Sequence, residues 1–230
     1  MKVEIVARTE GLGKYKGLTS EEIIAAIARH GKIKNDNGKL VKYLMDNKHW
    51  SPLDMVNFTF EIETSRSIGR QLLRHSSIKP QEHSTRYSDR VLIEPIELRL
   101  EHPTNRQSST DLVGTVSFDN GWSYIGDHNH KAYNAIVKAS DAVISIEEAY
   151  FSMVEAGIAK ECAREFLPLA LTTTISMNGS LRSWLAFLNV RLDGHTQKEA
   201  RLIAREIGET LEKEMPKVFS TIDWKNGMFM

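Results

Sequence analysis

Cysteine is the residue that this sequence has least of, and several larger features are also missing. The 230 residues include one cysteine, Cys162, which excludes an intrachain disulfide. Lys+Arg and Asp+Glu each number 30, so nothing predicts a general attraction to nucleic acid or to an anionic membrane. No apolar run approaches the length of a membrane span, and the N-terminal MKVEIVARTE lacks the apolar segment of a signal peptide. We therefore expect a cytoplasmic protein with no membrane and no nucleic-acid polymer as partner.

The common signatures of phosphate, metal and thiol sites are absent as well. The sequence has no GxGxxG after a predicted strand and no GxxxxGK[ST], which leaves a conventional Rossmann or P-loop site unsupported. His128 and His130 alternate in a polar stretch, a pattern more typical of a solvated loop than of a metal site, so we expect no metal. Cys162 lies in a predicted helix without a nearby histidine, so we expect a buried thiol rather than a nucleophile.

Hydrophobic periodicity indicates one α+β domain spanning 1–230, in which a central antiparallel sheet packs with several long helices. Thr19 and Glu22 form a capping box at the start of a helix, and residues 56–62 alternate as a half-buried strand does. Polarity and glycine make 102–123 a surface loop. The other predicted strands are 2–7, 91–100 and 167–177, and the other predicted helices are 40–44, 66–74, 124–156, 159–166, 180–191 and 196–215.

Residues 74–90, RHSSIKPQEHSTRYSDR, concentrate charge in a chain that has none overall. Arg66, Arg70 and Arg74 are spaced to share one helix face, which by itself is typical of a solvated stripe paired with acids. However, Arg74 is followed by a stretch rich in hydroxyl groups that also contains Arg86. Guanidinium groups, hydroxyls and backbone N–H groups that converge on a loop are suited to binding a phosphate.

A second group of cations follows later in the chain. Arg182 and Arg191 lie in SLRSWLAFLNVR, and Arg164 precedes them in AREFLPL. If the helix runs on past Gly194, Arg191 and His195 share a face. The alternative is that these are surface arginines on either side of a buried face around Trp184.

The arrangement of these residues resembles that of the flavin-dependent thymidylate synthases. That family's signature is Arg-His-Arg, seven residues, then Ser, and here Arg74-His75-Ser76 is followed after seven residues by Ser84. The resemblance extends in order from about residue 40 to residue 200. It is carried by YLMDNKHWSPLD, VNFTFEI, RQLLRH, QEHSTRYS, AREFLPL, SLRSW and FLNVRLDGHTQKE.

The resemblance implies a homotetramer that converts dUMP to dTMP. Methylene-tetrahydrofolate would supply the carbon, and FAD reduced by NADPH would be the redox cofactor. No enzyme cysteine acts as nucleophile in this family, which is compatible with a single Cys162. The implied catalytic residue is Arg191, a fixed cation that faces the uracil ring.

The resemblance also implies two sets of binding residues, carried over position by position. The dUMP contacts would be Gln71, Leu72, Leu73, Arg74, Glu82, His83, Ser84, Thr85, Arg86, Arg164 and Arg191. The flavin and folate contacts would be His49, Ser51, Arg74, His75, Ser76, Ser77, Glu82, Ser180, Leu181, Arg182, Ala186 and His195.

This sequence departs from the family pattern at two of these positions. Ser76 replaces the usual second arginine of the signature, and a hydroxyl cannot replace a bidentate cation, so we hypothesise weaker binding of FAD or folate, offset by Lys79. Ala186 stands where relatives carry a polar flavin contact. Three alternatives therefore stay open: a nucleotide- or RNA-binding module without catalysis, a different flavoenzyme acting on a nucleotide, and an inactive homologue.

Overall fold

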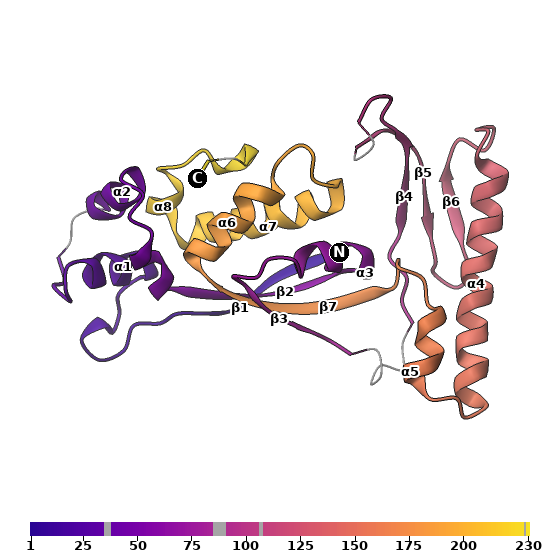
Figure 1. The fold of residues 1–230 in the computed structure, drawn as a ribbon, viewed down its shortest axis with the longest axis horizontal. Helices are drawn as coiled ribbons and strands as arrows, with labels where there is room; N and C mark the ends of the chain where they lie inside the picture. The colour runs from indigo at the N-terminus through magenta and orange to yellow at the C-terminus, as the bar shows by residue number, and fades with distance from the viewer. Residues whose placement is uncertain (35–37, 85–90, 106–107, 228) are drawn as a thin grey trace. The chain divides into compact units, whose positions relative to one another are not determined.

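Strands and helices alternate irregularly along the chain, as expected of an α+β fold (Figure 1). The computed structural model describes residues 1–34, 38–84, 91–105, 108–227 and 229–230. The strands are β1 (Lys2–Arg8), β2 (Asn57–Ser65), β3 (Lys79–Glu82), β4 (Ile96–Glu101), β5 (Ser109–Ser117), β6 (Ser123–Gly126) and β7 (Thr172–Ser180). The α-helices are α1 (Ser20–Ala28), α2 (Lys39–Asp46), α3 (Arg66–Leu72), α4 (Tyr133–Glu155), α5 (Lys160–Ala163), α6 (Leu181–Arg191), α7 (Lys198–Glu214) and α8 (Pro216–Phe219).

The internal contacts divide the chain into two compact units. Unit 1 contains Met1, Glu63–Gln71 and Glu82–Thr174, and unit 2 contains Lys2–Ile62, Leu72–Gln81 and Ile175–Met230. Single-domain organisation stays a prediction. In the described ranges, no helix combines the length and apolar character needed to cross a bilayer.

Most of a four-stranded sheet, ordered β1-β2-β7-β3, belongs to unit 2. The predicted alternation in 56–62 is confirmed, because Phe58, Phe60 and Ile62 are fully buried while the residues between them are partly exposed. The same pattern recurs in β7, where Ile175 and Met177 are fully buried. The sheet therefore presents a continuous apolar face.

Helices α6 and α7 pack over this sheet (Figure 1). Trp184 of α6 is fully buried, meets Phe60 edge-on with 4.9 Å between ring centroids, and donates from Nε1 to the Phe58 carbonyl at 3.0 Å. On α7, Gly208 gives the Trp224 ring room, since a Cβ there would lie 2.1 Å from that ring. Each large apolar side chain buried in this way contributes about 1.5–3 kcal/mol. This packing fixes α6, the helix that carries Arg182 and Arg191.

Unit 1 contains a three-stranded antiparallel sheet ordered β4-β5-β6, and α4 lies alongside it (Figure 1). Ile96 of β4 pairs with Val116 of β5. The Tyr124 ring lies across Gly114, where a Cβ would be 2.4 Å from the ring, and the Tyr124 hydroxyl donates to the Val113 carbonyl at 3.0 Å. The prediction of one central sheet is therefore incomplete, because the described residues also form this second sheet.

The surface loop predicted for 102–123 is wrong, because it contains β5 and the start of β6. Most of the side chains along Ser109–Leu112 are polar and all are exposed, so this part of β5 shows no apolar alternation. The helix predicted from about Tyr124 begins only at Tyr133, since Ser123–Gly126 pairs with β5. Hydrogen bonds to neighbouring strands make both segments extended, and the sequence pattern does not reveal such pairing.

Two local predictions are also wrong. Cys162 is exposed, because α5 is a short surface helix that buries Ala163 instead. Arg74 lies beyond α3, which ends at Leu72, so the three arginines do not share one helix. The helix carrying Arg191 ends at that residue, as predicted, and His195 lies in the turn that follows, so the condition for a face shared by Arg191 and His195 is not met.

Candidate active site

A tight turn after α3 carries the first part of the sequence signature and belongs to unit 2. His75 N donates to the Leu72 carbonyl at 3.3 Å, and Ile78 N donates to the His75 carbonyl at 3.1 Å. Ile78 is buried and anchors the turn, while Arg74, Ser76 and Ser77 are exposed. The turn thus exposes one cation and two hydroxyls to solvent, while His75 is half-buried.

His75 contacts Arg191, the predicted catalytic residue. Arg191 Nε donates to His75 Nε2 at 2.8 Å, and the His75 ring packs on Phe187 with 4.7 Å between centroids. Burial, with the positive charge of Arg191, lowers the pKa of His75 to about 4, so the ring is neutral near pH 7. Burial, followed by the like charge of Arg74, lowers the pKa of Arg191. Two cations therefore lie close enough to repel each other, which favours an anionic or electron-rich ligand between them.

The start of α6 forms a second cluster in unit 2. Ser180 caps this helix by accepting from Ser183 N at 3.2 Å, and its hydroxyl donates to Asp54 Oδ1 at 2.9 Å. Arg182 Nη1 donates to Asp54 Oδ2 at 3.2 Å. The Ser183 hydroxyl donates to the Ser77 carbonyl at 3.2 Å, which joins the turn after α3 to α6.

This second cluster suits the polar parts of a flavin dinucleotide. Arg182 remains 48% exposed, and the hydroxyl-bearing Ser51, Ser76 and Ser77 are exposed. A guanidinium group and hydroxyls can together hold phosphate and ribose oxygens, although Asp54 offsets part of the positive charge. Asp54 was not predicted from the sequence, and its only signal was its place within the matched segment YLMDNKHWSPLD.

Unit 1 holds Gln71, Glu82, His83, Ser84 and Arg164 among the predicted nucleotide contacts. Glu82 Oε1 accepts from the Thr173 hydroxyl at 2.7 Å and lies 3.8 Å from Arg66 Nη2. His83 N donates to the Thr174 carbonyl at 2.9 Å, so the backbone of this segment is held by β7. Thr173 and Arg66 are partners of Glu82 that sequence reasoning did not connect with it, because no spacing relates them.

The other predicted site residues differ in what they expose. Leu72 and Leu181 are fully buried, so only their backbone atoms could reach a ligand. His49 is exposed and meets Tyr43 edge-on, with 5.9 Å between ring centroids, and His195 Nδ1 lies 3.0 Å from Asp193 Oδ1. Gln71, Leu73, Ser84, Arg164 and Ala186 are partly exposed; Arg164 Nε lies 3.8 Å from Glu165 Oε1. Thr85 and Arg86 lie outside the described residues.

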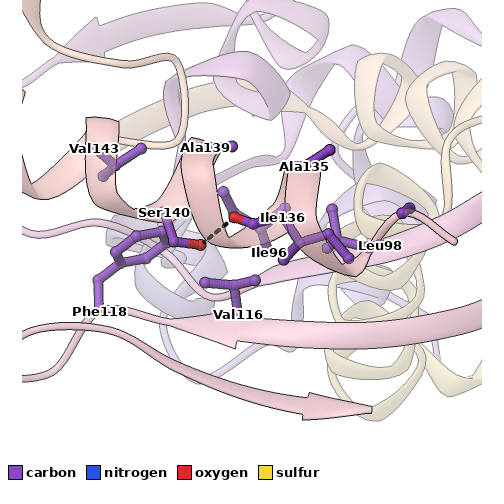
Figure 2. Close-up of a pocket in the computed structure, with 10 residues that line it drawn as sticks. Ile96, Leu98, Val116, Phe118, Ala135, Ile136, Ala139, Ser140 and Val143 are labelled. Atoms are coloured by element: carbon purple, nitrogen blue, oxygen red, sulfur yellow. Dashed lines mark hydrogen bonds between the residues drawn. The ribbon is translucent and has the colours of Figure 1, made fainter. Parts of the chain in front are cut away.

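A separate pocket of about 280 Å³ lies between the β4–β5 sheet and α4 (Figure 2). Its walls are apolar side chains such as Ile96, Leu98 and Phe118, together with Ser140. The Ser140 hydroxyl donates to the Ile136 carbonyl at 2.9 Å, as the dashed line in Figure 2 shows. No charged side chain lines this pocket, so it does not suit a nucleotide phosphate. Within the described ranges, no group of three or more His, Cys, Asp or Glu could hold a metal ion.

Comparison with known proteins finds relatives over most of the chain. The family model described as "Thymidylate synthase complementing protein" matches residues 12–217. A flavin-dependent thymidylate synthase of Synechocystis sp. is 36% identical over 213 residues, which is 90% of this chain and 91% of the relative. A probable flavin-dependent thymidylate synthase of Paramecium bursaria Chlorella virus 1 is 35% identical over 212 residues, or 90% and 92%. A flavin-dependent thymidylate synthase of Thermus thermophilus is 29% identical over 194 residues, or 84% and 66%.

Proposed function

The chain belongs to the thymidylate synthase complementing protein family, and we propose from this premise that it is a flavin-dependent thymidylate synthase. Its substrate is dUMP and its product dTMP. The cofactor is FAD, the carbon donor is methylene-tetrahydrofolate and the reductant is NADPH. The observation that supports this function most strongly is the pairing of Arg191 with His75 beside the positive charge of Arg74.

Arg191 acts on the pyrimidine ring. Methylation at C5 requires that carbon to become nucleophilic, which places negative charge on the ring nitrogen and carbonyls. A cation held in place before the reaction stabilises that charge without having to reorganise, and one such donor typically lowers a barrier by about 3–4 kcal/mol. Arg191 is half-buried and fixed through Nε, so it meets this requirement.

By resemblance, the nucleotide phosphate and sugar are bound by polar residues that follow α3 along the sequence. Arg74 supplies a cation, and Glu82, already oriented by Thr173, supplies an acceptor for a sugar hydroxyl. By resemblance, the other members of this set are Gln71, His83, Ser84, Thr85, Arg86 and Arg164.

The second cluster binds the flavin. Arg182 and Ser180, both tied to Asp54, with Ser51, Ser76 and Ser77 around them, hold its phosphates and ribose. The bound flavin supplies the hydride chemistry that no side chain of the protein can provide. Methylation then needs no cysteine nucleophile, which agrees with the position of Cys162 on the short surface helix α5.

The decisive experiment records the visible spectrum of the FAD-loaded protein during anaerobic addition of NADPH, with and without dUMP. We expect dUMP to start or accelerate flavin bleaching, and dTMP to form once methylene-tetrahydrofolate is added. A rate of flavin bleaching that is the same with and without dUMP would indicate a flavoenzyme with another substrate. Protein that binds no flavin would leave a nucleotide-binding relative without this activity.

A further inference from the structure

One partner of Arg191 is unusual for an arginine at a binding site. The side chain that best matches the guanidinium fork is a carboxylate, which also neutralises its charge. Here the Nε donor points at His75 Nε2, 2.8 Å away. An imidazole nitrogen accepts a hydrogen bond only when it carries no proton, so this contact requires a neutral ring with its proton on Nδ1.

The His75 ring is held from two further directions. Phe187 packs against its face, with 4.7 Å between centroids and 57° between planes. The backbone turn fixes its main chain through the Leu72 and Ile78 contacts. Phe187 lies one helical turn before Arg191 on α6, so the same helix supplies both the cation and the platform for its partner.

The Nε contact determines the orientation of the whole cationic group. A guanidinium is planar and rigid, so fixing the Nε–H direction fixes the plane in which its terminal nitrogens lie. A carboxylate in the same place would orient the group equally well. It would also cancel the positive charge and repel an anionic nucleotide. A neutral acceptor provides the orientation and does not itself cancel the charge.

We propose that His75 is a positioning residue for Arg191: a neutral acceptor that sets the plane of the guanidinium while leaving its positive charge to act on the pyrimidine ring. This role rests on the proposed function and extends the flavin contact expected for His75 from the sequence. The lowered pKa of His75 agrees with it, because Arg191 disfavours a proton on the ring.

Two substitutions at this position separate orientation from other roles. His75→Gln places an amide near the original Nε2, whereas His75→Asn places it near Nδ1, so only the first can still accept from Arg191. His128→Gln is the matched control, because it makes the same exchange at an exposed histidine of unit 1. Each FAD-loaded protein is titrated calorimetrically with dUMP and with 2′-deoxyribose 5-phosphate, which lacks the pyrimidine ring.

We expect His75→Gln to bind dUMP within about threefold of wild type and His75→Asn to bind it roughly 30- to 100-fold more weakly. The base-free phosphate should bind all variants alike, and kcat should follow dUMP affinity. Equal effects of Gln and Asn, or equal loss of both ligands, would overturn the proposal. So would a defect that appears only as weaker FAD binding and disappears at saturating FAD.

Arg191→Lys gives an independent check that does not depend on how well a single variant folds. Lysine has no Nε–H at this position, so adding His75→Asn to Arg191→Lys should leave dUMP affinity unchanged; a further loss as large as in the wild-type background would contradict the coupling. If wild-type protein binds dUMP but forms no dTMP, the proposed activity is wrong, and the ring-specific comparison still decides the role of His75.

Discussion

Two arginines on one helix are given different electrostatic properties by their partners. Arg182, at the start of α6, meets the carboxylate of Asp54, and Arg191, at its end, meets the neutral ring of His75. The first arginine is therefore partly neutralised and suits a site where hydroxyls and a cation share a ligand. The second is not neutralised by His75 and suits stabilisation of a charge that develops during a reaction.

Ser76 is the residue whose substitution tests the flavin cluster most directly. It is exposed and stands where the family signature has a second arginine. Ser76→Arg adds a bidentate cation next to Ser77, and one charge-assisted contact contributes about 1.5–3 kcal/mol. We therefore expect FAD to bind at least tenfold more tightly, as measured by fluorescence titration of the apoprotein.

The companion variant to Ser76→Arg is Lys79→Ala, which removes the cation expected to compensate for the missing arginine. We expect Lys79→Ala to weaken FAD binding. Unchanged FAD affinity in Ser76→Arg would count against this position as a flavin contact.

At the residue scale, the sequence predicts candidate site residues but not their partners. Arg74, His75 and Arg191 are predicted from the signature and its flanking segments, because ligand chemistry restricts residue type at a site. Asp54 and Phe187 were not, since their contacts join positions distant in the chain that no local spacing relates. All the proposed ligand contacts stay predictions, and Thr85 and Arg86 also lie outside the described residues.

At the scale of elements, sequence signals were most reliable where the deciding hydrogen bonds or apolar spacing lie within one helix. The capping box at Thr19 is confirmed, because Glu22 N donates to the Thr19 hydroxyl at 3.3 Å and Thr19 N donates to Glu22 Oε2 at 2.8 Å. The amphipathic pattern of 196–215 is confirmed as α7, with Ile203, Ile207 and Leu211 fully buried. Strands β5 and β6 were missed because interstrand pairing forms them.

Thr19→Ala should lower the free energy of unfolding by about 1 kcal/mol, since the Glu22 backbone N–H at the start of α1 loses the hydroxyl that accepts from it. For a chain of this size that corresponds to a fall in Tm of about 2–4 °C, measurable by calorimetry. Dissociation constants for dUMP and FAD should not change. Ser145→Ala, which removes a hydroxyl from within α4, is the control and should leave Tm unchanged or slightly raised.

At the scale of the whole molecule, unit 1 exposes several large apolar side chains. Leu112 is 57% exposed, Phe166 is 64% exposed and Ile125 is 77% exposed. Contiguous apolar exposure is typical of surfaces that bind another protein, so these residues are candidates for an interface between subunits. It supports the homotetramer that the family resemblance implies, and we propose that assembly for this chain.

Light scattering should therefore give a mass of about four times the 26.1 kDa of the chain. Ile125→Glu should lower that mass, because a carboxylate buried in an interface without a partner carries a large desolvation cost. A wild-type mass equal to one chain would refute the tetramer, and an unchanged mass in the variant would exclude this part of β6 from the interface.

The position of Arg182 and Arg191 at opposite ends of α6 also constrains which changes in length the chain can tolerate. One inserted residue within Leu181–Arg191 would advance everything beyond it by about 1.5 Å and rotate it by about 100°. The Ser180–Arg182 end would keep its place while Phe187 and Arg191 turned away from His75. Insertions and deletions within this helix should therefore be eliminated during evolution even where single substitutions are accepted, so that relatives differ in length elsewhere.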